Sequence, residues 1–340
     1  MISVYCWSDK EGKCSHGGRE VLPPRDALPD TLWIDLDAPT AEEEGLVLEQ
    51  FFHVHPLTLE DVTRPRREPD QPPHFPKVEE FPDYLFVIVN PLAPEVMHKT
   101  RLLDGDADHR PLVRQLSAVL TKQILITHHT VPLESISHLH ESLRKHEAHA
   151  GRGPDYLFHL VLDVMVDQYA PLLDKVDDSL DALEVEVFTR PSTRLLSELL
   201  ALKRGIITLR KTMIYEREVL ARLSRGEFGL IDAREMAYYR NVYDHLIRFT
   251  ELIEASREMA MDLMQTLLAS QANKLNEIMK VLTMISTTIL PMTLIAGIYG
   301  MNFKGWFPEL EWAYGYPFAL GLMALAGAAA FGFFRWMRWI

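Results

Sequence analysis

An uncharged tripeptide, Gly300-Met301-Asn302, ends the first of two segments that are long and apolar enough to cross a bilayer. Glycine permits a tight turn, and the asparagine side chain supplies a neutral carbonyl oxygen. Such an oxygen can hold the hydration shell of a cation, whereas a carboxylate would bind a dehydrated ion more strongly and release it slowly. The tripeptide therefore predicts a cation-selecting mouth at a membrane surface.

The segment that precedes the tripeptide carries an uncharged stripe, because its members recur at helical spacing. The stripe consists of Asn276, Met279, Leu282, Ser286, Leu290, Thr293 and Gly297. A path for a bare divalent ion would be expected to carry carboxylates, so the pattern favours a cation that keeps most of its water, with two leucines as apolar constrictions. From spacing alone, a face of small residues that packs against other helices in lipid explains the stripe equally well.

Residues 281–301 and 317–334 contain no charged side chain, and each is close to the length that a transmembrane helix needs. Two basic residues precede the first segment (Lys274, Lys280), and two follow the second (Arg335, Arg338). The connection between the segments holds one lysine and two glutamates (Lys304, Glu309, Glu311). By the positive-inside rule both termini are expected in the cytoplasm. Because residues 1–21 have no apolar signal core, we expect a multi-pass protein of the cell (inner) membrane with its large domain inside.

The net charge is −13, with 48 acidic and 35 basic residues. No basic cluster is available to neutralise phosphates, so nucleic acid is not an expected partner. No catalytic motif is visible in the sequence, so an enzyme is not expected. Cys6, Cys14 and His16 could form a metal site, but three ligands on one short segment are a weak signal and free thiols are favoured. The 14 histidines, including His128, His129, His146 and His149, keep zinc and cobalt open as ions.

The N-terminal part alternates β-rich and helical runs, with strands expected at 31–36, 83–90, 113–120 and 123–127. Thr40 and Glu43 form a capping-box signature at the start of a helix. From about residue 155 only helices are expected, first 156–188 and 193–223, which Pro191 separates. Because neither Gly nor Pro occurs between Asp232 and Leu290, one helix of roughly 70 residues is expected next, and it enters the membrane. Its apolar stripe needs partner helices, from its own chain or from other copies.

These patterns divide the chain into an α/β domain (1–150), an antiparallel helical pair (151–230), a stalk helix (231–280), a first transmembrane helix (281–301), an outer loop (302–316), a second transmembrane helix (317–334) and a basic tail (335–340). Two spans cannot enclose an aqueous path, because little lateral wall remains. A pore would need several copies of the chain.

At its C-terminal end the sequence resembles the CorA family of magnesium and cobalt transporters. The resemblance rests on Tyr299-Gly300-Met301-Asn302-Phe303, on Pro308-Glu309-Leu310 and Gly315-Tyr316-Pro317, and on the segment 276–282. It extends more loosely over nearly the whole chain. It implies an α+β cytoplasmic domain, an αβα sandwich, followed by a stalk helix and two transmembrane helices in a funnel-shaped homopentamer surrounded by lipid.

The resemblance further implies that Gly300, Met301 and Asn302 form the selectivity ring for hydrated Mg²⁺, with Co²⁺ as a further candidate ion. Five members of the uncharged stripe fall on the family's pore-lining positions (Asn276, Met279, Leu282, Leu290 and Thr293), and Glu309 would attract cations. Family members are held closed by intracellular Mg²⁺ between neighbouring cytoplasmic domains. Here the corresponding residues are Glu95 and Asn241, with Asp244 as a further acid, and the asparagine predicts weaker binding of the regulatory ion.

Two alternatives remain. A zinc transporter of the ZntB type shares this architecture, although Met301 favours the magnesium branch. A membrane-anchored metal sensor that conducts nothing would explain the acidic domain and the stalk, but it has no need of the uncharged stripe.

Overall fold

The computed structural model describes residues 1–98, 111–189, 192–301 and 312–339 of the chain. It consists of two compact units, Met1–Met264 and Gln265–Ile340. The helix α8 (Met236–Tyr299) begins in the first unit and ends in the second.

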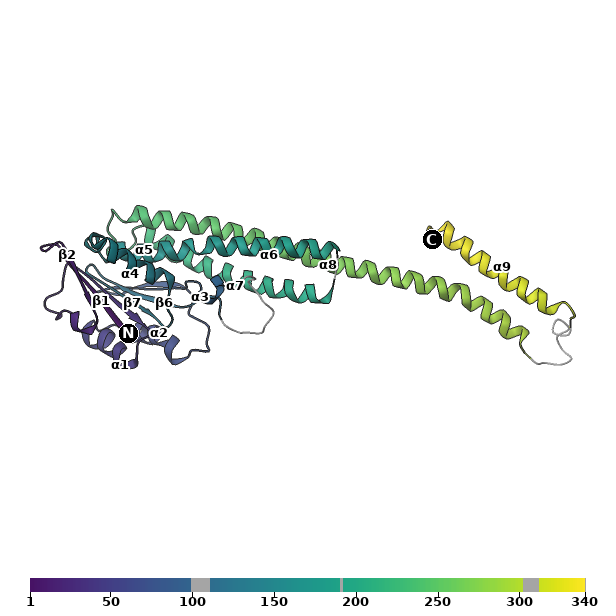
Figure 1. Cartoon of the computed structure of the whole chain (residues 1–340), viewed down its shortest axis with the longest axis horizontal. Helices are drawn as coiled ribbons and strands as arrows, with labels where there is room; N and C mark the ends of the chain where they lie inside the picture. The colour runs from purple at the N-terminus through teal and green to yellow at the C-terminus, as the bar shows by residue number, and fades with distance from the viewer. Residues whose placement is uncertain (99–110, 190–191, 302–311, 340) are drawn as a thin grey trace. The chain divides into compact units, whose positions relative to one another are not determined.

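A seven-stranded sheet forms the centre of the first unit, in the order β2-β1-β3-β7-β6-β5-β4 (Figure 1). The strands are β1 (Ile2–Ser8), β2 (Lys13–Gly17), β3 (Thr31–Asp37), β4 (Lys77–Glu80), β5 (Leu85–Val89), β6 (Leu116–Leu120) and β7 (Ile124–His129). Among the described strands, β3 and β7 are the one parallel pair. The central strands β5, β6 and β7 are buried at every position, as expected for strands covered on both faces.

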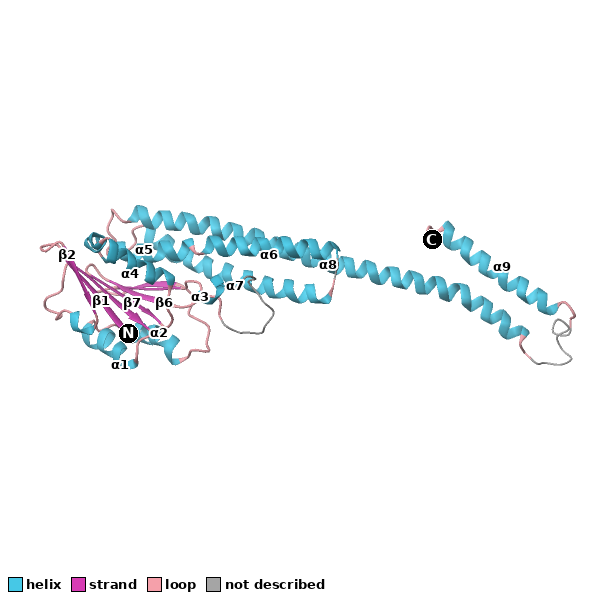
Figure 2. Ribbon diagram, in the orientation of Figure 1, coloured by secondary structure: helices cyan, strands magenta, loops and turns pink. Residues whose placement is uncertain are grey.

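Helices cover both faces of this sheet (Figure 2). On one face lie α1 (Ala41–Glu44), the turn η2 (Gly45–Phe51) and α2 (Pro56–Arg67), which pack Val47, Leu48 and Val62 against the apolar side chains of the sheet. The predicted capping box is confirmed, since the Thr40 hydroxyl accepts from Glu43 N and the Glu43 carboxylate accepts from Thr40 N. Because helices lie on both faces of the sheet, the expected αβα sandwich is confirmed.

The opposite face is covered by α4 (Glu134–Lys145) and α5 (Pro154–Asp167). Shorter elements are η1 (Arg19–Val21), α3 (Pro94–His98) and η3 (Glu147–Arg152). The single helix expected over 156–188 is wrong, because the chain breaks at Gln168 and continues as α6 (Tyr169–Thr189). The helix α7 (Thr193–Ser224) then packs against α6.

The first half of α8 is anchored within the first unit by contacts with three helices. Tyr239 Oη donates to the carbonyl oxygen of Asp155 (2.7 Å), Ser256 Oγ donates to Asp177 Oδ1 (2.8 Å), and Arg210 forms an ion pair with Glu254. The apolar stripe predicted on this helix runs through Val242, Leu246, Phe249, Ile253, Ala260, Leu263, Leu267, Leu275, Ile278 and Leu282. As far as Leu267 its members are buried, except Phe249, which is partly buried, and the last three are exposed. Partners from this chain therefore cover the stripe only as far as Leu267.

Candidate functional site

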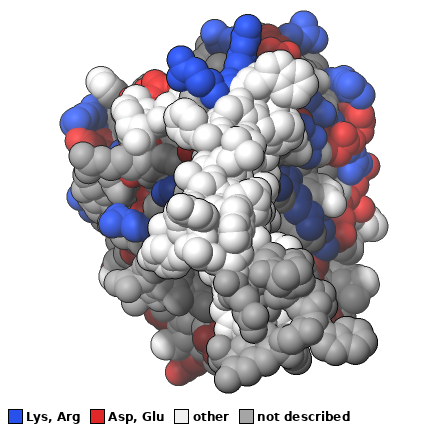
Figure 3. Space-filling view, turned by 90° about the vertical axis from the view of Figure 1, so that its right-hand side faces the viewer, with Lys and Arg blue, Asp and Glu red and all other residues white. Residues whose placement is uncertain are grey.

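Two helices of the described chain are long and apolar enough to cross a membrane, α8 and α9 (Gly315–Trp336). The most apolar stretch of α8 has no buried side chain, and Leu290 and Leu294 are 74% and 64% exposed. Figure 3 shows a broad band of uncharged side chains on the second unit. Apolar surface of this extent needs lipid or other protein to cover it.

One face of α8 is hollowed into a groove of about 710 Å³. Nine uncharged residues line it: Ile285, Ser286, Ile289, Leu290, Thr293, Leu294, Gly297, Ile298 and Met301. The structure thus brings four members of the predicted stripe together with one member of the predicted selectivity tripeptide. The remaining stripe residues, Asn276, Met279 and Leu282, are exposed on α8 before the groove begins.

The threonine hydroxyl in this groove is already committed as a donor. Thr293 Oγ1 donates to the carbonyl oxygen of Ile289 (3.0 Å), and one turn before the groove Thr283 Oγ1 donates to that of Met279 (2.8 Å). Each hydroxyl then keeps only its lone pairs for a further partner. Water molecules around a cation point their hydrogens outward, so acceptors of this kind suit a hydrated cation better than a hydrated anion.

A different face of α8 packs against α9 in an antiparallel hairpin. The ring of Tyr299 lies 6.5 Å from that of Phe318, and Lys280 Nζ lies 5.8 Å from the ring of Trp339 at the other end. Between these pairs, a Cβ on Gly327 would lie 2.4 Å from Met292 Cε. The absence of a side chain at Gly327 therefore permits close approach of the two helices.

Gly300 follows the last turn of α8. Its amide donates to the carbonyl oxygen of Ala296 (2.9 Å), and a Cβ on Gly300 would lie 2.9 Å from the same oxygen. Because that neighbour is backbone, any side chain here would force the turn to shift. Asn302 and Glu309 lie outside the described residues, so their predicted roles stay predictions.

The predicted regulatory residues are exposed and belong to separate elements. Glu95 lies on α3 and is 46% exposed, with Arg114 Nη2 at 3.6 Å from its Oε1. Asn241 and Asp244 are exposed on α8. Within the described part of one chain, no group of three or more His, Cys, Asp or Glu side chains is arranged to hold a metal ion.

The cysteines occupy opposite faces of the N-terminal hairpin. Cys6 is paired with Ser15 and Cys14 with Trp7, and side chains of successive strand residues point to opposite faces. Cys6 packs against the apolar core, whereas Cys14 shares its face with His16. The two sulfur atoms therefore do not converge on one ion.

Several histidines are held by buried carboxylates. His128 Nε2 lies 2.9 Å from Glu44 Oε1, and His129 and His140 lie 3.2 and 3.1 Å from the two oxygens of Asp35. Burial alone would raise the pKa of Asp35, but hydrogen bonds from these histidines and Thr127 hold the pKa of that carboxyl well below its usual range. These contacts stabilise the sheet and leave the histidines committed to carboxylates.

Sequence reasoning missed two polar features. Glu216 on α7 is completely buried, where its carboxylate accepts from Tyr169 Oη (2.7 Å) and from Asn90 N (3.1 Å). Burial raises the pKa of Glu216 to about 8. The second feature is an arginine-lined pocket beside the sheet. No local pattern marks either one, because their members come from distant segments.

Comparison with known proteins gives a consistent result along the chain. Residues 30–336 match the family model described as "CorA-like Mg2+ transporter protein". The "Cobalt/magnesium transport protein CorA" of Thermotoga maritima is 36% identical over 321 residues, which cover 94% of this chain and 86% of that protein.

Two solved structures share the fold. The complete CorA magnesium transporter of Methanocaldococcus jannaschii gives a TM-score of 0.79 at 21% identity and covers 100% of this chain and 99% of its own. The ZntB cytoplasmic domain of Vibrio parahaemolyticus gives 0.61 at 14% identity, covering 80% of this chain and 98% of its own. At these identities the likeness concerns the fold alone.

Proposed function

The chain belongs to the CorA-like Mg²⁺ transporter family, and we propose that five copies of it form a membrane pore that carries hydrated Mg²⁺ into the cytoplasm. The observation that carries this proposal is the uncharged groove on α8, which contains Ser286, Leu290, Thr293, Gly297 and Met301. A relative is named for both cobalt and magnesium transport, so Co²⁺ is a second candidate ion.

The pore wall follows from the exposed face of α8. The stripe from Asn276 to Gly297 is about 32 Å long at helical rise, which is enough to cross the hydrocarbon layer. Leu282 and Leu290 are 54% and 74% exposed, and in a ring of copies they would form two apolar constrictions. Between and beyond them, the hydroxyl oxygens of Ser286 and Thr293 would contact the water shell of the ion.

Selectivity is assigned to the mouth at Gly300, Met301 and Asn302. Because Gly300 lies close to the Ala296 carbonyl oxygen, a side chain at this position would shift the backbone next to the tripeptide's other members. Glu309 would raise the local cation concentration near this ring. Inward movement is favoured by a cytoplasm-negative potential, which supplies about 4.6 kcal/mol per divalent ion at 100 mV.

Regulation is assigned to intracellular Mg²⁺ held between neighbouring copies near Glu95, Asn241 and Asp244. Each of these side chains is exposed, as a site shared between copies requires. The guanidinium of Arg114 near Glu95 would oppose a cation there, and Asn241 supplies no charge. We therefore expect the regulatory ion to bind more weakly than at a site with two carboxylates.

The decisive experiment is ion influx into liposomes that contain the purified protein, with Mg²⁺, Co²⁺ and Zn²⁺ tested in parallel and a proton gradient present or absent. Asn302→Ala is expected to abolish Mg²⁺ influx while the oligomer still forms, as measured by its size in detergent. The control is Gln271→Ala, which removes an amide from α8 away from the stripe and should leave influx unchanged.

Two results would overturn the assignment. Parental Mg²⁺ influx through an assembled Asn302→Ala variant would exclude the asparagine from selectivity. Proton-dependent Zn²⁺ influx without Mg²⁺ influx would indicate a zinc transporter of the ZntB type. Absence of flux for every ion would favour a membrane-anchored metal sensor.

A further inference from the structure

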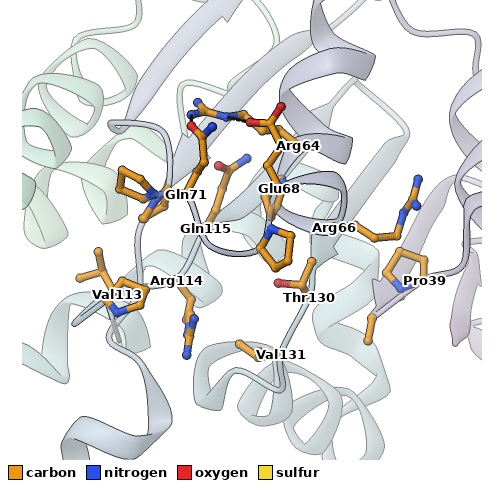
Figure 4. A pocket seen from close by; sticks show the side chains of 16 residues that line it. Pro39, Arg64, Arg66, Glu68, Gln71, Val113, Arg114, Gln115, Thr130 and Val131 are labelled. Carbon is orange, nitrogen blue, oxygen red and sulfur yellow. Dashed lines mark hydrogen bonds and ion pairs between the residues drawn. The ribbon is translucent and has the colours of Figure 1, made fainter. Parts of the chain in front are cut away.

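A pocket of about 320 Å³ opens beside the sheet of the first unit (Figure 4). Ala38 and Pro39 follow β3, and Thr130 and Val131 follow β7, so the pocket lies at the carboxyl ends of the parallel strand pair. In open α/β sheets, ligands bind in the crevice outside the carboxyl ends of the strands. The position alone makes this pocket a candidate binding site.

The backbone at the pocket wall is strained. Ala38 has a φ of 41°, which places a residue with a side chain in the left-handed region. Its amide donates to the carbonyl oxygen of His129 (2.8 Å), which ties the end of β3 to the end of β7. Residues held in such conformations cluster at ligand-binding sites, where the surrounding structure maintains them.

Three arginines line the pocket, and two of them hydrogen-bond to neighbouring side chains. Arg64 donates to Glu68 (3.3 Å) and to Gln71 (2.7 Å), whereas Arg66 donates twice to Glu44 Oε2 (2.9 and 2.6 Å). The remaining lining arginine is Arg114, which extends alongside Val131 in Figure 4.

Among the described residues, the guanidinium of Arg114 is paired with Glu95 through one long contact, 3.6 Å between Nη2 and Oε1, which is beyond ordinary hydrogen-bond distance. Its Nε is buried and has no hydrogen-bond partner among these residues. A buried donor without an acceptor is unfavourable. Nε and Nη2 point in parallel, which matches two oxygens of a phosphate group.

The walls of the pocket are preorganised. Six prolines line it: Pro39, Pro65, Pro69, Pro72, Pro73 and Pro111. Gln115 is fixed by three hydrogen bonds, to His74 N, the Asp61 carbonyl oxygen and Ser117 Oγ. Fixed walls lose little entropy when a ligand binds, and the volume lies at the small end of the range for small-molecule pockets.

We propose that this pocket binds the phosphate group of a small phosphorylated molecule, with Arg114 as the bidentate anchor. The strained turn at Ala38 and the residues after β7 also line the pocket. Such a site lies in the first unit and is separate from the pore face of α8, so its presence does not depend on which ion the protein transports.

Calorimetric titration of the full-length protein in detergent tests the proposal, with inorganic phosphate and glucose 6-phosphate as probes and glucose as the uncharged control. Both phosphates are expected to bind, and glucose is not. Arg114→Gln should weaken phosphate binding by about tenfold or more, because it removes the positive charge and the two parallel N–H donors of the guanidinium. Arg25→Gln, the same change at an exposed arginine outside the pocket, should leave the affinity unchanged.

A second variant keeps the test valid if Arg114→Gln fails to fold. Val131→Glu leaves Arg114 in place and adds a carboxylate that competes for it, so phosphate binding should again be lost while the melting temperature without ligand is retained. Absence of binding for both phosphates in the parent protein would overturn the proposal. Equal affinity in the parent and in the folded pocket variants would do so as well.

Discussion

The two halves of α8 contrast in how their apolar residues are covered. In the first unit, Val242, Leu246 and Ile253 are completely buried against helices of the same chain. In the second unit, Leu275, Leu282 and Leu290 continue the helix but are 63%, 54% and 74% exposed. The first unit therefore completes its core within one chain, whereas the second leaves its apolar side chains to be covered by lipid or other protein.

The polar groups show the same contrast. In the first unit, buried carboxylates such as Asp35 and Glu44 accept hydrogen bonds from histidine, arginine or threonine. Along the groove of the second unit there is no charged residue among the described ones, and the Thr293 hydroxyl donates to its own helix. Charge thus stabilises the first unit, while the neutral groove of the second is suited to passage of an ion with its water.

The largest expected effect comes from removing the second unit. A chain that ends at Met264 should fold, remain soluble without detergent and melt cooperatively, because the buried residues of the sandwich and its helices, apart from Leu267 on α8, lie before that point. Circular dichroism and size-exclusion chromatography without detergent measure this. An aggregated or unfolded product would show that the first unit needs the membrane part to fold.

A matched pair of leucine substitutions sharpens the contrast within one helix. Leu246→Ala should lower the free energy of unfolding of the first unit by about 2–5 kcal/mol, because the leucine is completely buried. Leu290→Ala should leave that free energy unchanged but alter ion flux, because its side chain is exposed in the groove. Chemical denaturation and liposome flux of both variants provide the check, and similar destabilisation by both would contradict the contrast.

A smaller effect concerns the buried carboxyl of the first unit. The folded-state pKa of Glu216 is raised from 4.5 to about 8, so the folded state binds more protons between these values. The free energy of unfolding should therefore fall as pH rises through this window, by up to about 1.4 kcal/mol per pH unit from this group.

Glu216→Gln removes the titrating group, while its one amide oxygen can still accept from Asn90 N and its NH2 group can donate to the Tyr169 hydroxyl. The variant should lose this part of the pH dependence, as measured by denaturation at several pH values between 5 and 8.5. Glu218→Gln on the exposed side of α7 is the control and should keep the parental slope. An unchanged slope in Glu216→Gln would mean that this carboxyl is not the titrating group.

The sequence predicted the two membrane helices and the central strands because both depend on long apolar runs. β3, β5, β6 and β7 are such runs and were predicted, but β1, β2 and β4 were missed. β2 reads Lys-Cys-Ser-His-Gly and is largely exposed, so it has no apolar alternation to mark it. The break at Gln168 was also missed, although Pro171 in the first turn of α6 is a signal for it, because proline is tolerated in the first turn of a helix but not in its interior. At the break Tyr169 turns inward to Glu216.

The groove stripe could be predicted because Ser286, Leu290, Thr293 and Gly297 lie on one helix at fixed spacing. The arginine pocket could not, because Ala38, Arg64, Arg114 and Thr130 come from four separate segments that only the folded sheet brings together. The position of Glu216 is a tertiary effect of the same kind. Local periodicity predicts a face of a helix, but it does not predict which distant segments meet.

The central claim is that the groove face of α8 lines the path of the ion, and cysteine modification tests it most directly. In a background without Cys6 and Cys14, Thr293→Cys places a thiol in the groove, whereas Met292→Cys places one on the face that approaches Gly327 of α9. Mg²⁺ influx into liposomes is measured before and after treatment with a positively charged thiol reagent. The account predicts that Thr293→Cys is blocked and Met292→Cys is not; block of Met292→Cys with Thr293→Cys unaffected would place the ion path on the other face of the helix.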